Sequence, residues 1–182
     1  LLMRSRPQIP PRTRFWPCFA ACAWFFALLA TVSSLNGDDS GDAASAWEPV
    51  IVLTENAQVY RGNEPGAKLL PGSINYVSSR NKEWLLLPRY NAWVHQQHVK
   101  PLAAALESLT KGIELEPSAT LHHYRGIVYS ELGKQEEALA DFAAAVKLGL
   151  ASSGLYLNRG LAWQRSGQAE NAMADFTAAI DL

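Results

Sequence analysis

The chain has 182 residues, of which 48% are hydrophobic and 18% charged, which suits one ordinary domain or two small ones and excludes a large enzyme. Four of the 16 basic residues lie in the first 37 residues, which contain none of the 17 acidic residues, so the rest of the chain has a net charge of −5. Nucleic-acid binding needs clustered Lys and Arg, so the net negative charge of the chain after residue 37 argues against a nucleic-acid partner.

Residues 1–34 have the order of a secretory signal peptide: basic residues, then an apolar run, then small polar residues. Arginines occur between residues 4 and 14, residues 15–32 read FWPCFAACAWFFALLATV, and Ser33 and Ser34 follow. The apolar core after Pro17 is about 15 residues long, which suits a signal peptide and is short for a membrane span of roughly 20. Two interpretations stay open, a cleaved signal peptide and an uncleaved membrane anchor. Both predict export, to the periplasm, the cell envelope or the medium.

Residues 35–47 are predicted to be a solvated linker. The stretch 36–48 reads NGDDSGDAASAWE and shows neither helical nor strand periodicity. Both cysteines, Cys18 and Cys22, precede it in the apolar run. The rest of the chain therefore has no thiol for a disulfide, a zinc–thiolate site or a cysteine nucleophile.

Short β-prone runs separated by turn residues make up residues 48–101. The expected strands are 50–53, 58–60, 68–70, 74–78, 84–87 and 92–94, with a short exit from residue 99, and the expected turns are 63–66, 71–72, 80–82 and 89–91. So many short strands in so little chain predict a small antiparallel barrel. Most of its buried area is expected to come from Val59, Leu69, Val77, Trp84, Trp93 and Val99.

This segment resembles a bacterial SH3-like (SH3b) domain. The matching residues are Val59-Tyr60-x-Gly62, Leu70-x-Gly72, Trp84-Leu85, Ala92-Trp93-Val94 and Val99. Where Ala92 stands, the family usually has Gly. Bacterial members often bind envelope polymers or peptides, so the resemblance implies such a ligand without assigning contact residues. We expect Trp84 and Trp93 in the barrel core; the alternative is an exposed recognition role.

Residues 102–182 contain a sequence repeat. The segment HHYRGIVYSELGKQEEALADFAAAV, which begins at His122, aligns without gaps with YLNRGLAWQRSGQAENAMADFTAAI, which begins at Tyr156. The small residues at the repeated glycine and alanine positions would let two helices approach closely, and the repeated aromatic residues would fill the gaps. The aligned pairs are Arg125/Arg159, Gly126/Gly160, Tyr129/Trp163, Gly133/Gly167, Ala138/Ala172, Asp141/Asp175, Phe142/Phe176 and Ala145/Ala179.

The pattern, with its period of about 34 residues, resembles tetratricopeptide (TPR) repeats, which implies an all-α solenoid of stacked helix pairs after the all-β barrel. The implied units are a partial one at 102–117 and two further ones at 119–152 and 153–182. Gly133 and Gly167 are expected to end the first helix of each unit in the left-handed conformation. The chain ends inside the last helix, which we interpret as truncation after Leu182; the alternative is a partner that covers the exposed face.

The family's usual pattern places a set of mostly uncharged side chains on the concave face of the array. Such a set would accept an extended or helical peptide. Asp141 and Asp175 are expected to pair with Arg125 and Arg159, and an ordinary packing role is the alternative for His123. The candidate groove residues are Thr120, His123, Ile127, Ser130, Leu157, Leu161 and Gln164.

No catalytic, cofactor or metal site is predicted. The chain lacks a phosphate-binding loop, a nucleophile elbow and a His-Glu-x-x-His motif, and His95-x-x-His98 has no third ligand nearby in sequence. The leading hypothesis is a non-enzymatic exported scaffold that binds proteins or peptides. The alternatives are an envelope-polymer binding protein in which the helices act as a spacer, and an enzyme subunit whose active site lies on another chain.

Overall fold

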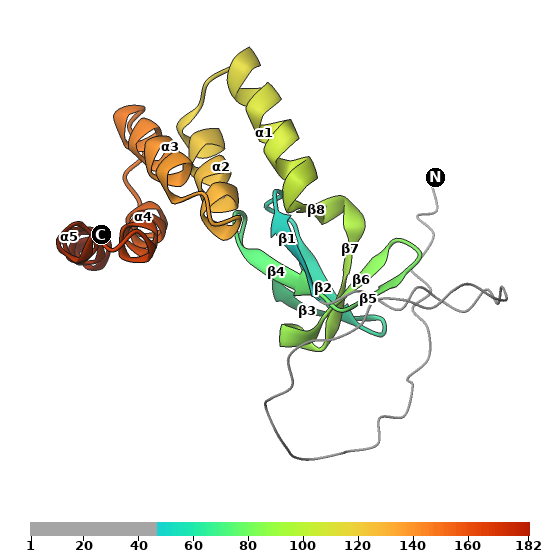
Figure 1. Cartoon of the computed structure of the whole chain (residues 1–182). Coiled ribbons are helices and arrows are strands. Elements are labelled where there is room, and N and C mark those ends of the chain that lie inside the picture. Colours follow the sequence, from blue (N-terminus) through green and yellow to red (C-terminus); the bar gives the residue numbers. More distant parts are fainter. Residues whose placement is uncertain (1–46) are drawn as a thin grey trace, which may run out of the picture.

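The computed structural model describes residues 47–182, in which a β-rich part is followed by five α-helices (Figure 1). The predicted signal or anchor segment, residues 1–34, and residues 35–46 of the predicted linker lie outside this range. Among the described residues, no helix combines the length and the apolar character needed to cross a bilayer.

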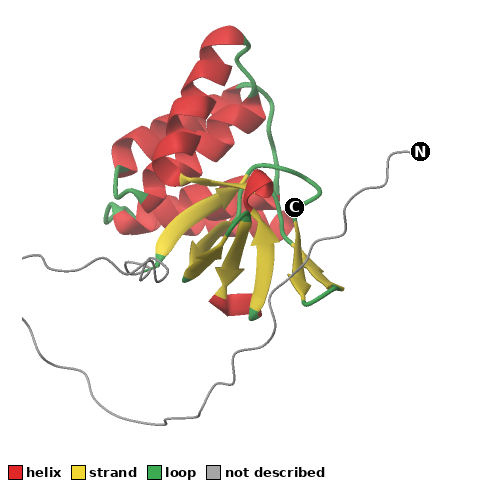
Figure 2. Cartoon of the chain, turned by 90° about the vertical axis from the view of Figure 1, so that its right-hand side faces the viewer, coloured by secondary structure: helices red, strands yellow, loops and turns green. Residues whose placement is uncertain are grey.

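The β-rich part, called the β module below, comprises residues 48–101 and forms two antiparallel sheets (Figure 2). One has the order β4-β1-β8 and the other β3-β2-β7-β6-β5. The strands are β1 (Glu48–Val52), β2 (Gln58–Arg61), β3 (Glu64–Lys68), β4 (Ile74–Val77), β5 (Ser79–Asn81), β6 (Trp84–Leu87), β7 (Ala92–His95) and β8 (Val99–Pro101), with short 3-10 turns η1 (Pro88–Tyr90) and η2 (Gln96–His98).

Two turn predictions were wrong in this region. The residues expected to form a turn at 63–66 instead form most of β3, because the chain already reverses at Gly62 (φ +59°) and Asn63. Likewise, β5 occupies part of the expected turn at 80–82, and its hairpin to β6 turns at Lys82, which has a φ of +54°. In both segments, residue types that favour turns therefore also occur within the neighbouring strands.

The barrel predicted for residues 48–101 is not closed. Strand β3 pairs only with β2 and β5 only with β6, so both ends of the five-stranded sheet are open. The two sheets are nevertheless connected, because β4 runs into β5 and the Ser78 amide donates to the Leu86 carbonyl.

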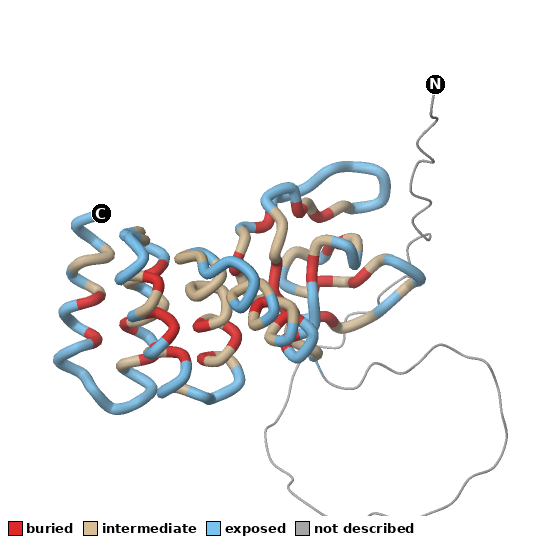
Figure 3. The backbone as a smooth tube through the Cα atoms, turned by 90° about the horizontal axis from the view of Figure 1, so that it is seen from above, coloured by how far each residue is buried: buried red, intermediate tan, exposed pale blue. Residues whose placement is uncertain are grey.

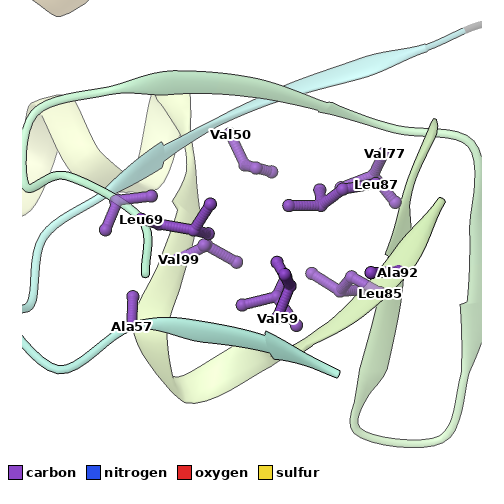
Figure 4. Close-up of a cluster of buried hydrophobic side chains, with 11 residues drawn as sticks. Val50, Ala57, Val59, Leu69, Val77, Leu85, Leu87, Ala92 and Val99 are labelled. Atoms are coloured by element: carbon purple, nitrogen blue, oxygen red, sulfur yellow. The ribbon is translucent and has the colours of Figure 1, made fainter. Parts of the chain in front are cut away.

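One apolar core lies between the two sheets (Figure 4). The predicted core residues Val59, Leu69, Val77 and Val99 are buried there, together with further aliphatic side chains. The prediction for Trp84 and Trp93 was wrong, because β6 and β7 alternate and present other residues to this core. The buried side chains of these two strands are Leu85, Leu87, Ala92 and Val94.

Five α-helices follow the β module. They are α1 (Leu102–Leu115), α2 (Ala119–Glu131), α3 (Gln135–Lys147), α4 (Ser153–Arg165) and α5 (Ala169–Asp181). Gly133 and Gly167 both have a φ of +78°, which confirms the predicted left-handed ends. The turn after α3, which lacks proline, uses Gly149 with a φ of +91° for the same purpose.

The three-stranded sheet packs against α1 and α2. Ile51 of β1 is fully buried in a cluster with Leu102 and Leu109 of α1 and Val128 of α2. Leu53 and Ile74 complete this contact from the sheet side. The β module and the first helices therefore share an apolar core, and the sheet covers one end of the helical array.

Candidate peptide-binding surface

The two full helix pairs are held together by the same close contact. A Cβ on Gly126 would lie 2.7 Å from Cε1 of Phe142, and one on Gly160 would lie 2.6 Å from Cε1 of Phe176. The nearest backbone atoms, the carbonyl oxygens of Ala138 and Ala172, would be 3.2 and 3.3 Å away. Glycine is required at both positions because any side chain would push the paired helices apart.

Each pair is also joined by a largely buried ion pair. Arg125 donates from Nε and Nη2 to the Asp141 carboxylate at 2.7 and 2.8 Å, and Arg159 does the same to Asp175 at 2.7 and 2.6 Å. These bonds confirm the expected pairing. Hydrogen bonding to the carboxylates raises the pKa of both guanidinium groups, which stay charged.

The same steric and ionic contacts thus recur at equivalent positions of successive units. Residues 102–182 form a helical repeat region of the TPR type. The two helix pairs that repeat these contacts, called the full units below, are α2–α3 and α4–α5.

The repeat region carries a third periodic feature, which was not predicted from the sequence. Ser118 and Ser152, which precede the two full units at equivalent positions, each accept a hydrogen bond at Oγ from the backbone N–H three residues later, at 3.2 Å. Both are N-caps, of α2 and α4. The signal was present in the sequence as Ser-x-x-Leu at both positions.

The candidate groove residues of the first full unit are mostly engaged within the protein. Ile127 packs in the apolar clusters and lies near Gly72, on which a Cβ would be 3.3 Å from the Ile127 Cδ1. Ser130 is buried and accepts a hydrogen bond from Arg165, 2.9 Å away on α4. Of the candidates in this unit, only Thr120 is exposed.

His123, the fourth candidate of this unit, is also packed. Its ring lies near those of Tyr124 and Phe142, and its Nε2 is 3.2 Å from Nδ2 of Asn158 on α4. Burial lowers the pKa of His123 to about 4, so the ring is neutral at physiological pH. In this structure His123 therefore makes contacts within the protein, as expected for the alternative of an ordinary packing role.

The second full unit presents the corresponding positions to solvent. Leu157 and Leu161 are 48% and 37% exposed and lie four residues apart on one face of α4, with Gln164 exposed one turn further. These three residues align with His123, Ile127 and Ser130 of the first full unit. In the first full unit, Asn158 and Arg165 of α4 contact His123 and Ser130, and Gly72 of the β module lies against Ile127. Figure 3 shows mostly exposed chain along α5, at the C-terminal end of the array.

A second feature lies on the outer face of the five-stranded sheet. The Tyr60 and Trp84 rings meet edge to face at 5.6 Å, and the Trp84 and His95 rings at 5.2 Å. Trp93 is directly opposite Tyr60 in the strand register, and all four residues are partly exposed. This aromatic face was not predicted from the sequence, because both tryptophans were expected to lie in the core.

The histidine pair at the end of β7 is not part of a metal cluster. His95 Nε2 lies 3.1 Å from the Glu83 carboxylate, and His98 Nδ1 is 3.0 Å from Oγ1 of Thr54. Within residues 47–182, no group of three or more His, Cys, Asp or Glu side chains is arranged to hold a metal ion.

No family model matches the chain, and no curated protein sequence does either. Solved structures do show similarity. The second TPR of Spaghetti (RPAP3), bound to the HSP90 peptide SRMEEVD, is 30% identical with a TM-score of 0.43, and the match covers 44% of this chain and 76% of that one. Two MamA structures are 22% and 23% identical, each with a TM-score of 0.42, and cover 44% of this chain and 47% of theirs.

Proposed function

We propose that the protein is an exported, non-enzymatic scaffold that binds a peptide segment of a partner protein. The peptide binds on the face of α4 that carries Leu157 and Leu161. The observation that carries this proposal is the exposure of Leu157 and Leu161 at positions whose equivalents in the preceding unit, His123 and Ile127, are covered by the protein itself. Two apolar side chains one turn apart provide anchor contacts for an extended or helical peptide.

The adjoining polar groups support a specific orientation of such a peptide. Gln164 is exposed one turn beyond Leu161, and the Asn158 amide lies beside His123 at the border between the two units. An amide side chain both donates and accepts hydrogen bonds, as peptide backbone groups require. Because the open surface spans one unit, we expect modest affinity for a single peptide.

A peptide library displayed against residues 47–182 tests the proposal. We expect enriched sequences with two apolar residues and at least tenfold weaker binding to the Leu157→Asp/Leu161→Asp double variant, because burying each new carboxylate is unfavourable. Leu148→Asp is the matched control, since Leu148 is 50% exposed but lies at the end of α3. The proposal is contradicted if the enriched peptides bind the double variant with the same affinity as the unchanged protein.

Export is supported by the sequence of residues 1–34 alone. The alternatives of a cleaved signal and a retained anchor are separated by N-terminal sequencing of the product recovered outside the cytoplasm. A product found only in the cytoplasm with residues 1–34 intact contradicts export.

A second function, binding of an envelope polymer by the β module, is favoured by the partly exposed rings of Tyr60, Trp84 and Trp93. Such rings offer large apolar surfaces beside polar atoms. The test uses residues 47–182, because the β module shares its core with α1 and α2 and is not an independent unit. Trp84→Ala should abolish co-sedimentation with purified wall material if this function holds, whereas Leu157→Asp should leave it unchanged.

A further inference from the structure

A pocket of about 420 Å³ lies between the β2–β3 hairpin and η1. This volume is in the range that holds small ligands. Val59 and Ala92, which belong to the core, form its apolar base, and the backbone of β3 from Pro65 to Ala67 forms one wall. The pocket is separate from both α4 and the aromatic face.

Two arginines at the opening are both positioned by Tyr90. Arg61 donates from Nη2 to the Tyr90 carbonyl oxygen at 2.9 Å, which links β2 to η1. The Arg89 guanidinium lies over the Tyr90 ring, 5.9 Å from its centroid. The Tyr90 side chain in turn packs against the core between the two sheets. Both arginines therefore contact Tyr90, a residue that is itself anchored, and both line the pocket.

The remaining hydrogen-bond donors of these arginines are not used by an ion pair. Within residues 47–182, the arginines with a carboxylate within 4.0 Å are Arg80, Arg125 and Arg159. Glu64 also lines the pocket but forms no such pair there. Two guanidinium groups against one carboxylate leave the opening with a net positive charge, and a guanidinium group binds oxyanions with two parallel hydrogen bonds.

We propose that this pocket binds a small ligand composed of an oxyanion attached to a short apolar body. The oxyanion lies between Arg61 and Arg89, and the apolar body contacts Val59 and Ala92. A carboxylate and a phosphate monoester share this chemistry. The site does not depend on the peptide surface of α4, so either proposal can fail without the other.

Nuclear magnetic resonance titration of residues 47–182 tests the site, using the side-chain Nε–H signals of Arg61 and Arg89 and the amide of Tyr90. The probes are propionate, propyl phosphate and, as the uncharged control, propionamide, all at one ionic strength. We expect saturable shifts at these three residues with an affinity roughly in the millimolar range for at least one anion. The tighter-binding anion distinguishes a carboxylate from a phosphate ligand.

Three variants separate a site from general charge attraction. Arg61→Gln/Arg89→Gln should weaken binding at least about tenfold, since charge-assisted bonds are lost. Glu64→Gln should tighten it a few-fold by removing the one repelling carboxylate, which a purely structural role would not produce. Lys68→Gln removes one positive charge, as each of the two arginine substitutions does, but from exposed β3 outside the pocket, and should leave binding unchanged. Non-saturable shifts, equal shifts with propionamide, or equal loss in the Lys68 variant overturn the proposal.

Discussion

Gly126 and Phe142 occupy one contact in which the glycine has no room for a methyl group, and Gly160 and Phe176 repeat it one unit later. The phenylalanine ring takes the space that a Cβ would fill. Phe142 is fully buried and Phe176 is partly buried. The spacing between the two helices of a unit is therefore set by a pair of residues rather than by the average composition of the helices.

Gly126→Ala should destabilise the protein by about 1–3 kcal/mol, because an added methyl group in a packed contact forces helix or ring displacement. Gly160→Ala should act in the same direction. Gly154→Ala is the matched control: it lies in α4 with no atom within 4 Å of its Cβ position, and alanine favours helices. Urea denaturation measures all three, and equal destabilisation by Gly154→Ala would contradict the steric explanation.

Asp141→Ala should lower the free energy of unfolding by about 3 kcal/mol, because it leaves Arg125 and His122 in a mostly buried environment without their common partner. Glu107→Ala removes the same charge from an exposed pair with Lys111 and should have no measurable effect. Thermal unfolding at neutral pH compares the two variants. Similar melting temperatures for both would show that the buried pair adds nothing to stability.

Folding stability should decrease as the pH is lowered from 6.5 toward 4, in part through His123. Its pKa is about 4 in the folded protein and 6.5 in the unfolded chain, so the unfolded state binds more protons in this range. His123→Gln removes that contribution, and its stability should fall less over the same range. Denaturation curves at several pH values test this. Above pH 6.5 the difference between the two proteins should be constant, and a difference that is constant down to pH 4 as well would refute the assignment.

Ile51→Ala should destabilise the β module and the helices together, by about 2–5 kcal/mol, because the lost side chain is fully buried between β1, α1 and α2. Near-ultraviolet and far-ultraviolet circular dichroism should report one coincident transition. Separate transitions for aromatic packing and for helix content would mean that the two parts unfold independently.

The helical half was predicted well because its contacts are local and repeated. The requirement for glycine opposite phenylalanine, and for arginine opposite aspartate, recurs in each unit, so two copies of the sequence reveal it. In the β module, by contrast, β6 reads WLLL and β7 reads AWVH, with apolar residues on both faces. Such runs do not show which face is buried, and the two tryptophans were assigned to the wrong one.

The sequence by itself determined the helix pairs and the ion pairs within them, because each follows from side chains at a fixed separation along the chain. Only the tertiary structure decided which repeat faces are open. Gly72 lies against Ile127, a residue far from it in the sequence, and so covers α2, whereas Leu161 at the equivalent position of α4 is exposed. No local pattern encodes that contact, because it depends on how the two sheets pack against the first helices.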